Sequence, residues 1–262
     1  MKRTDSKWLT WLPPVLTAGV ILGLWQAIIS VFHVPDYLLP TPRQVAGALW
    51  RDHEFLFNAA LHTGGSALVG FFAAVIGGAL VAVALANSRW MKAALYPWVL
   101  FVQMVPVVVM VPIFVLWFGA GFPSVVAISF VISFFPVVAS TTLGLVSTDR
   151  ALLELFAIQQ ATKLQEIFLL RVPSALPYFL TGVKIAATLA PIGAISGEFL
   201  AGTEPNTLGY ILIYDRAIPG KMPEVFAVAL VTCALGFMFV GAVQWLSWRL
   251  LRQWHESAQS SE

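Results

Sequence analysis

The sequence predicts an all-α integral membrane protein with six transmembrane helices, and three observations support this. Of its 262 residues, 59% are hydrophobic and only 11% are charged, whereas soluble domains average roughly 45–50% apolar and about 25% charged residues. Uncharged stretches long enough to cross a bilayer recur along the chain. Basic residues are concentrated in alternate connections between these stretches. The composition excludes an ordinary soluble enzyme and a disordered chain, and the net charge of +2 indicates no nucleic-acid partner.

The predicted spans are gaps between charged residues, because a bilayer core needs about 20 apolar residues in a helix. Single gaps meet this length in residues 8–32, 63–88 and 225–248, and residues 172–197 form a fourth that only Lys184 interrupts. The gap over residues 93–148 is long enough for two helices, and Gly119–Pro123 supplies the turn between them. The first stretch is too long for a signal peptide and lacks a cleavage site, so we interpret it as a retained helix.

Basic residues fall unequally on the two sides of the predicted membrane. If the N-terminus is cytoplasmic, ten of the 15 Lys and Arg residues lie on that side: Lys2, Arg3, Lys7, Arg89, Lys92, Arg150, Lys163, Arg171, Arg249 and Arg252. The opposite side holds Arg43, Arg51, Arg216 and Lys221. Because cytoplasmic loops carry an excess of basic residues, we expect both termini to be cytoplasmic.

Short helices are expected outside the spans. In the first external loop, Thr41 and Pro42 have the residue types of an N-cap and a first helical position, and a second external helix is expected around residues 207–217. On the cytoplasmic side, residues 149–173 are amphipathic, with one helical face formed by Leu152, Leu155, Phe156 and Gln159. Pro177 is expected to open the fifth span. The residues alone leave open whether the amphipathic segment lies on the lipid surface or contacts a partner subunit.

The sequence lacks the motifs of nucleotide, metal and covalent chemistry. The phosphate-binding pattern G-x-x-x-x-G-K-[ST] is absent, and the only Gly-Lys pair, Gly220-Lys221, is followed by Met222. Three histidines in the first external loop are spaced irregularly, and Cys233 is the only cysteine, so no metal-ligand set is expected. We therefore expect no cofactor and no enzymatic activity of the chain's own.

The cytoplasmic segment carries a family pattern. Glu154, Gln160 and Leu170-Arg171-Val172-Pro173 have the spacing of the E-A-A-x3-G-x9-I-x-L-P loop, and the segment thereby resembles the permease subunits of binding-protein-dependent ABC importers. Other segments are similar to the nitrate, sulfonate and taurine branch of that family: Leu38–Pro42, His62–Ser66, Pro112–Gly121, Phe135-Pro136, Gly197–Phe199 and Leu208–Tyr210. The loop departs from the pattern where Gln160 replaces the glycine and Leu155-Phe156 replaces the two alanines. If that glycine forms a backbone turn, either Gln160 forms it at a cost or the turn differs.

The resemblance implies the fold of a type I ABC importer permease, with one transmembrane domain over residues 1–262 and a cytoplasmic coupling loop at residues 149–173. It implies a bacterial cytoplasmic membrane as the location, and a small organic or anionic solute as the cargo. The implied partners are a second permease copy, two cytoplasmic ATPase subunits and an extracytoplasmic substrate-binding protein. By the same resemblance, the ATPase contact is expected at Glu154, Phe156, Ala157, Gln160, Ala161, Lys163, Glu166 and Pro173.

The translocation path is expected along the third to fifth spans. Pro106 and Pro112 in the third span and Pro191 in the fifth free backbone carbonyls, which a membrane tolerates only beside protein or a water-filled cavity. Glu198, an ionisable group at the outer end of the fifth span, is a candidate for the path, and the alternative is a carboxylate satisfied by water or loop amides. Lys184 is expected to extend its side chain toward the cytoplasmic interface.

Two other functions are compatible with these residues. The chain could be a self-sufficient secondary transporter that uses Lys184 and Glu198 as a coupling pair, although the sequence shows no inverted repeat of interrupted helices. It could also be a membrane scaffold without a path, which the proline-interrupted spans disfavour. A stoichiometric ATPase partner would distinguish an importer permease from both.

Overall fold

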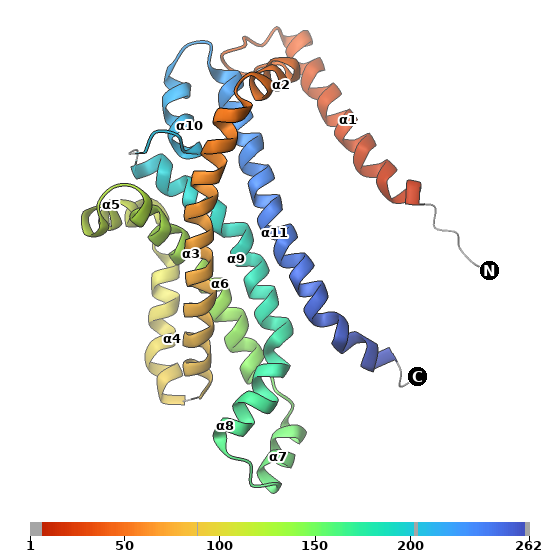
Figure 1. The fold of residues 1–262 in the computed structure, drawn as a ribbon, viewed down its shortest axis with the longest axis vertical. Helices are drawn as coiled ribbons and strands as arrows, with labels where there is room; N and C mark the ends of the chain where they lie inside the picture. The colour runs from red at the N-terminus through yellow and green to blue at the C-terminus, as the bar shows by residue number, and fades with distance from the viewer. Residues whose placement is uncertain (1–6, 88, 202–203, 260–262) are drawn as a thin grey trace, which may run out of the picture.

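The computed structural model describes residues 7–87, 89–201 and 204–259, and every regular element within these ranges is a helix. In chain order the helices are α1 (Lys7–Phe32), α2 (Pro42–Arg51), α3 (His53–Asn87), α4 (Arg89–Met104), α5 (Val107–Phe118), α6 (Phe122–Val146), α7 (Arg150–Ile158), α8 (Lys163–Gln165), η1 (Glu166–Arg171), α9 (Val172–Ala201), α10 (Leu208–Ala217) and α11 (Met222–Gln259). Figure 1 shows an elongated bundle in which α3, α6 and α9 lie together. Helices α2 and α10 cover one end of the bundle, and α7 and α8 protrude from the other.

The predicted spans are present, and one of them is broken. Five helical segments of the described chain are long and apolar enough to cross a membrane: Leu12–Phe32, His53–Asn87, Phe122–Val146, Lys163–Ala201 and Met222–Leu250. The third predicted span is the pair α4 and α5, which is bent by 101°. The predicted turn at Gly119–Pro123 is confirmed, because it separates α5 from α6 and its two glycines have positive φ.

The start of the fifth span differs from the sequence prediction. Pro177 does not open this helix, because α8, η1 and α9 form one continuous helix from Lys163 to Ala201. Just before Pro173, which has no N–H, the Val172 N–H donates to the carbonyl of Ile167, five residues back. This wider π-helical turn accommodates the proline ring, so the helix continues where the sequence predicts an end.

Small residues bring α3, α6 and α9 into close contact, as is common between membrane helices. A methyl group at Gly70 of α3 would lie 2.7 Å from the Ser129 Cβ of α6, and one at Gly193 of α9 would lie 2.9 Å from the Ser129 Cα. The Ser129 hydroxyl also donates to the Ala190 carbonyl of α9 at 3.0 Å. Helix α6 is therefore held between α3 and α9 with no room for larger side chains at these contacts.

Both short helices predicted outside the spans are present and begin as expected. Helix α2 begins at Pro42, and Thr41 forms a capping box with Gln44. In that box the Gln44 N–H donates to the Thr41 hydroxyl at 3.3 Å, and the Thr41 N–H donates to the Gln44 side chain at 2.7 Å. Helix α10 begins at Leu208, and the Thr207 hydroxyl accepts from the Tyr210 N–H.

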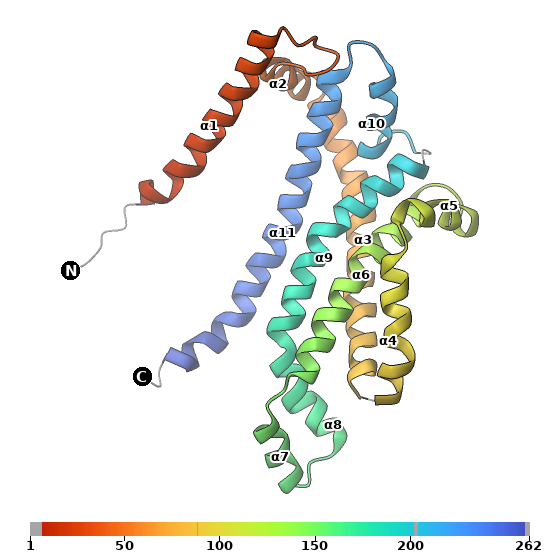
Figure 2. The ribbon, with the colours of Figure 1, turned by 180° about the vertical axis from the view of Figure 1, so that it is seen from behind.

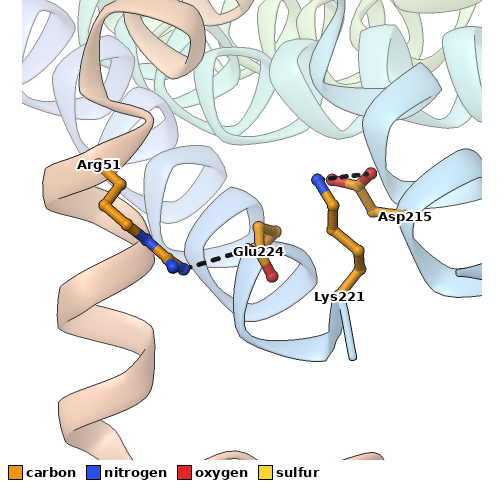
Figure 3. Close-up of polar contacts among 4 residues, drawn as sticks. All are labelled: Arg51, Asp215, Lys221 and Glu224. Carbon is orange, nitrogen blue, oxygen red and sulfur yellow. Dashed lines mark hydrogen bonds and ion pairs between the residues drawn. The ribbon is translucent and has the colours of Figure 1, made fainter. Parts of the chain in front are cut away.

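The end of the bundle that α2 and α10 cover has its own apolar cluster. Its buried residues come from α2, α3, α10 and α11: Val45, Ala48, Leu56, Ala59, Leu208, Ile211, Ala227, Val228 and Leu235. Two ion pairs lie at this end (Figure 3), Arg51 with Glu224 at 3.2 Å and Lys221 with Asp215 at 3.8 Å. Burial raises the pKa of the Asp215 carboxyl above its ordinary value; Glu224 and Asp52 also raise it, and Lys221 lowers it. These contacts tie α2 to α11 and α10 to the turn before α11.

Helix α1 leans away from the rest of the bundle in both Figure 1 and Figure 2. Its contact with the bundle lies near α2, where Ile29 is buried and the Trp25 ring centroid lies 5.8 Å from that of Phe226. Most of its other described side chains are exposed and apolar. Almost the full length of a spanning helix is thus free to contact lipid or another subunit.

Gly182 provides a test of the close packing between α6 and α9. A methyl group there would lie 2.8 Å from the Pro136 carbonyl oxygen and 3.1 Å from the Val137 Cα, and both are backbone atoms. We expect Gly182→Ala to lower the free energy of unfolding in detergent by about 1–3 kcal/mol through overpacking. The control Gly236→Ala on α11, which has no atom within 4 Å of the added methyl group, should not lower it. Equal stability of the two variants would contradict this packing.

Candidate functional site

The loop between α6 and α9 is built from local hydrogen bonds. Asp149 is the N-cap of α7, and its carboxylate accepts from the Ala151 N–H at 2.9 Å. At the other end of α7, the Gln160 N–H donates to the Ala157 carbonyl and the Ala161 N–H donates to the Phe156 carbonyl. This pair of bonds is the Schellman motif, which ends a helix with one residue in the left-handed conformation.

Gln160 is the left-handed residue of this motif, with φ of 54°. In the loop pattern that the segment resembles, glycine stands at this position, and glycine adopts the conformation without steric cost. Of the two alternatives that the sequence leaves open, the structure shows the first: Gln160 itself forms a left-handed turn. A residue with a side chain costs about 1–2 kcal/mol in this conformation, so the turn forms against the local preference of Gln160.

The second half of the loop is fixed to α9 by a capping box and an ion pair. The Gln165 N–H donates to the Thr162 hydroxyl at 3.3 Å, and the Thr162 N–H donates to the Gln165 side chain at 2.8 Å. The Arg171 guanidinium contacts the Glu166 Oε1 through Nε and Nη2, each at 2.6 Å. Because a π-helix brings residues five apart onto one face, this ion pair closes across η1.

The residues predicted for the ATPase contact differ in how accessible they are. Four are exposed, namely Glu154, Ala157, Gln160 and Lys163, and four are half-buried, namely Phe156, Ala161, Glu166 and Pro173. The Glu166 carboxylate already bonds to Arg171, so within this chain it positions the loop.

Sequence reasoning did not single out the most exposed apolar side chain of the loop. Ile158, the last residue of α7, is 80% exposed, and Leu155 one turn earlier is also exposed. Their i, i+3 spacing was a readable signal of a shared helix face. Phe156, which lies between them in the sequence, is half-buried. The three side chains together give the tip of the loop an apolar surface.

Glu198 lies in a buried polar cluster at the opposite end of α9. Its Oε2 accepts from the Thr63 hydroxyl at 2.9 Å and from the Gly209 N–H at 3.0 Å. The Thr63 hydroxyl oxygen in turn accepts from the Leu208 N–H at 3.0 Å. A carboxylate is favoured beside the free N–H groups at the start of a helix, which here is α10. The geometry agrees with the expectation of a carboxylate satisfied by loop amides.

Gly209 allows α10 to approach α9 this closely. A methyl group there would lie 2.5 Å from the Glu198 Cβ and 2.7 Å from the Phe199 backbone nitrogen. Sequence reasoning named Glu198 but not its partners Thr63 and Gly209. The sequence did contain a signal for these partners, because Glu198, Thr63 and Gly209 all stand in segments that are similar to the same permease branch. The fold brings these three segments together.

The prolines predicted for the path occupy different positions. Pro106 stands directly before α5, at the break between α4 and α5. Pro112 lies inside α5, and Pro191 is buried inside the continuous α9, roughly 10 Å along the helix from Glu198. Only Pro106 therefore coincides with an interruption, and the other two are accommodated within helices.

The groups gathered at the two ends of α9 position helices, and they do not form a reactive centre. Within the described ranges, no group of three or more His, Cys, Asp or Glu side chains is arranged to hold a metal ion. At one end a carboxylate fixes the start of a short helix, and at the other an ion pair fixes a protruding loop.

Comparison with known proteins decides the family. The chain matches the model of the family described as binding-protein-dependent transport system inner membrane component, over residues 70–252. The chain belongs to this family. It is 32% identical over 240 residues to a probable ABC transporter permease protein of Haemophilus influenzae. The aligned region covers 92% of this chain and 97% of that protein.

Two relatives are named for particular solutes. The formylaminopyrimidine transport permease of Halalkalibacterium halodurans is 35% identical, with 94% of this chain and 96% of that protein covered. The riboflavin transport system permease of Chloroflexus aurantiacus is also 35% identical, with 92% and 90% covered. As a permease of this family, the chain is a multi-pass inner-membrane subunit of an ABC importer, and such subunits are not themselves ATPases. The type I permease fold predicted from the loop pattern is confirmed.

The turn at Gln160 can be tested in the purified permease. Gln160→Gly should stabilise the loop by about 1 kcal/mol, because glycine removes the steric cost of the left-handed conformation. The expected result is slower cleavage of the loop by a protease of broad specificity. The control Gln159→Gly changes the neighbouring residue, whose φ is −77°, and should speed cleavage because it adds only backbone freedom. Faster cleavage of both variants would contradict the role of Gln160.

The Glu198 cluster yields a second prediction for the permease. Glu198→Ala removes the acceptor of the Thr63 hydroxyl and the Gly209 N–H, and should lower the free energy of unfolding by about 1–3 kcal/mol. Glu198→Gln keeps an oxygen acceptor and should lose less than half as much. Thermal unfolding in detergent measures both variants. An equal loss in the two would show that the hydrogen bonds to this side chain are not what holds α10.

Proposed function

We propose that two copies of this chain form the membrane path of the importer, each docked through residues 149–173 to one of two cytoplasmic ATPase subunits, with solute delivered by an extracytoplasmic binding protein. The observation that carries the proposal is the loop itself. In a chain of the permease family, this loop protrudes from one end of the bundle (Figure 2). Its side chains Leu155 and Ile158 are exposed to solvent. Exposed apolar side chains that lie together on a protruding loop are typical of a surface that a partner covers.

The proposed orientation places this loop in the cytoplasm. Ten of the 15 basic residues fall on the loop's side of the membrane if the N-terminus is cytoplasmic, and that asymmetry supports the assignment. Of these, Lys2 and Arg3 lie outside the described residues. The end covered by α2 and α10 then faces the binding protein, and the ion pairs of Figure 3 lie at that face.

Motion of the loop would reach the membrane through α9. The helix is continuous from Lys163 to Ala201, and the Glu166–Arg171 ion pair stiffens its wider first turns. When ATP brings the two ATPases together, each loop is displaced, and α9 carries the displacement to α6, against which it packs. This is coupling between distant sites through an element with two arrangements.

The proposed path runs beside α5, α6 and α9. Pro106 lies at the sharp bend between α4 and α5. Pro112 and Pro191 lie within α5 and α9, two of the helices that border the proposed path. Glu198 shapes the outer end by fixing α10 against α9. The exposed length of α1, together with other exposed apolar side chains, is available to lipid and to the second permease copy.

The cargo that we propose is a small organic or anionic solute. Relatives of this chain are named for formylaminopyrimidine, riboflavin, aliphatic sulfonates, taurine and nitrate, which are small solutes of different charge. Such a range supports selection of the solute by the separate binding protein. The ligand found on the binding protein that co-purifies with the complex would identify it.

The self-sufficient transporter is disfavoured by the positions of its two proposed coupling residues. Lys184 and Glu198 stand 14 residues apart on the same helix, α9, roughly 21 Å along it. The Glu198 carboxylate is already bonded to Thr63 and Gly209. A pair so separated cannot exchange a proton or ion directly, whereas family membership directly supports an importer subunit.

Ile158 provides the sharpest test of the docking loop. Ile158→Asp replaces an exposed apolar side chain by a charge, so it should leave thermal unfolding of the permease unchanged while it weakens ATPase binding at least about tenfold. The amount of ATPase that co-purifies in mild detergent and the hydrolysis rate of the complex measure this. Gln159→Glu is the control, because it adds the same charge one residue later without removing apolar surface. Wild-type assembly of Ile158→Asp would refute docking at this tip.

A further inference from the structure

Lys184 is the only charged residue in the central part of α9. The uncharged run from Val172 to Gly197 is interrupted at this position alone, and the flanking charges are Arg171 and Glu198 at the two ends. Neither end residue is a partner for it, because Arg171 is itself a cation and Glu198 bonds to Thr63 and Gly209. The ammonium of Lys184 forms no ion pair or hydrogen bond with any side chain in the described ranges.

The neighbours of Lys184 place it near the middle of the membrane span. Two residues before it, Gly182 packs against Pro136 and Val137 of α6, and two residues after it, the Ala186 carbonyl accepts from the Ser133 hydroxyl at 3.4 Å. Ser133 stands close to the centre of α6 (Phe122–Val146), roughly 20 Å from the loop end of that helix. A four-carbon stem does not cover this distance, which argues against the expected extension of the side chain to the cytoplasmic interface.

One face of α9 at this level is polar and open. Thr181, Ile185 and Thr188 are exposed and Lys184 is half-exposed, whereas Gly182, Val183, Ala186, Ala187 and Ala190 are buried against the bundle. The hydroxyl protons of Thr181 and Thr188 bond to carbonyls four residues earlier, at 2.9 and 3.2 Å. Their oxygen lone pairs remain free to accept hydrogen bonds from water or from an ammonium group.

An unpaired ammonium in the middle of a lipid-facing surface is strongly disfavoured. Charged residues within membrane helices face a bundle interior or a water-filled cavity, and they mark the route of ions or substrates. An ammonium group at this position is favoured if the open face of α9 borders water in the assembled importer, and the translocation path is the water-filled space that an importer provides at this depth.

We propose that Lys184, between Thr181 and Thr188, is a binding station for the negatively charged group of the solute, halfway along the path. The proposal rests on the function proposed above, because it requires the path to run beside α9. The ammonium supplies a positive charge and three N–H donors, which suit a carboxylate, sulfonate or phosphate group. A single monovalent contact is strong enough to attract an anion and weak enough to release it.

The test uses the importer complex in lipid nanodiscs, with Cys233→Ser as background and Thr188→Cys as a reporter one turn from Lys184. Two methanethiosulfonate reagents serve as probes, one carrying a sulfonate and the other a trimethylammonium group. We expect both to modify the introduced thiol, with a preference for the anionic reagent. Adding Lys184→Met should lower the ratio of the anionic to the cationic rate by about tenfold. Lys184→Arg should preserve the ratio.

The control is Trp50→Cys on α2, at the end of the bundle away from the loop, where the side chain is 82% exposed and water-soluble reagents can reach it. Its ratio should not respond to Lys184→Met. No modification at Thr188→Cys in an ATP-hydrolysing complex would show that this face does not border water, and modification with an unchanged ratio would show that Lys184 attracts no anion. Either result overturns the station, whereas failure of the ATPase to co-purify would overturn the proposed function itself.

Discussion

The close approach of α3, α6 and α9 is the constraint on which the rest of this permease depends. Inside a bilayer, apolar surface gives little drive for helices to associate, so packing contacts and hydrogen bonds between helices must hold them. Gly70 and Gly193 present backbone to opposite sides of α6 at the level of Ser129. The Ser129 and Ser133 hydroxyls then bond to carbonyls of α9. The bent pair α4–α5, the protruding loop and α10 are all attached to this three-helix unit.

The two ends of α9 are attached to their surroundings in different ways. At one end, hydrogen bonds of the Glu198 carboxylate and of Thr63 fix the start of α10. Gly209 allows α10 to pack directly against the backbone of α9 there. At the other end the loop is held by Gln160, a capping box and one ion pair, all of them local to the loop and the first turns of the helix. Under the proposed coupling, a force applied to the loop would move α9 and α6 together, because the outer end of α9 is held by contacts from other segments. Rocking of this unit is the motion that we propose for the importer.

Much of the fold could be predicted because lipid restricts what a sequence can do. Long uncharged runs must be helices, so the spans, the turn at Gly119–Pro123 and the caps at Thr41 and Thr207 were readable. Features that depend on contacts with neighbouring helices could not be predicted. Pro106 breaks its span, whereas Pro191 lies inside a continuous helix where surrounding helices pack around it. The same holds for the π-helical turn before Pro173, and for Glu198, whose partners come from two distant segments.

Gln160 and Lys184 both oppose their local surroundings. Gln160 adopts a left-handed backbone that glycine would adopt freely, and Lys184 places a charge where the helix has only apolar and hydroxyl neighbours. A sequence that otherwise agrees with its fold tolerates such conflicts mainly at functional sites. One stands in the loop that faces the proposed ATPase, and the other stands on the open face of α9. Both conflicts therefore lie on surfaces that the single chain leaves uncovered, where the assembled importer can supply the missing partner or the missing water.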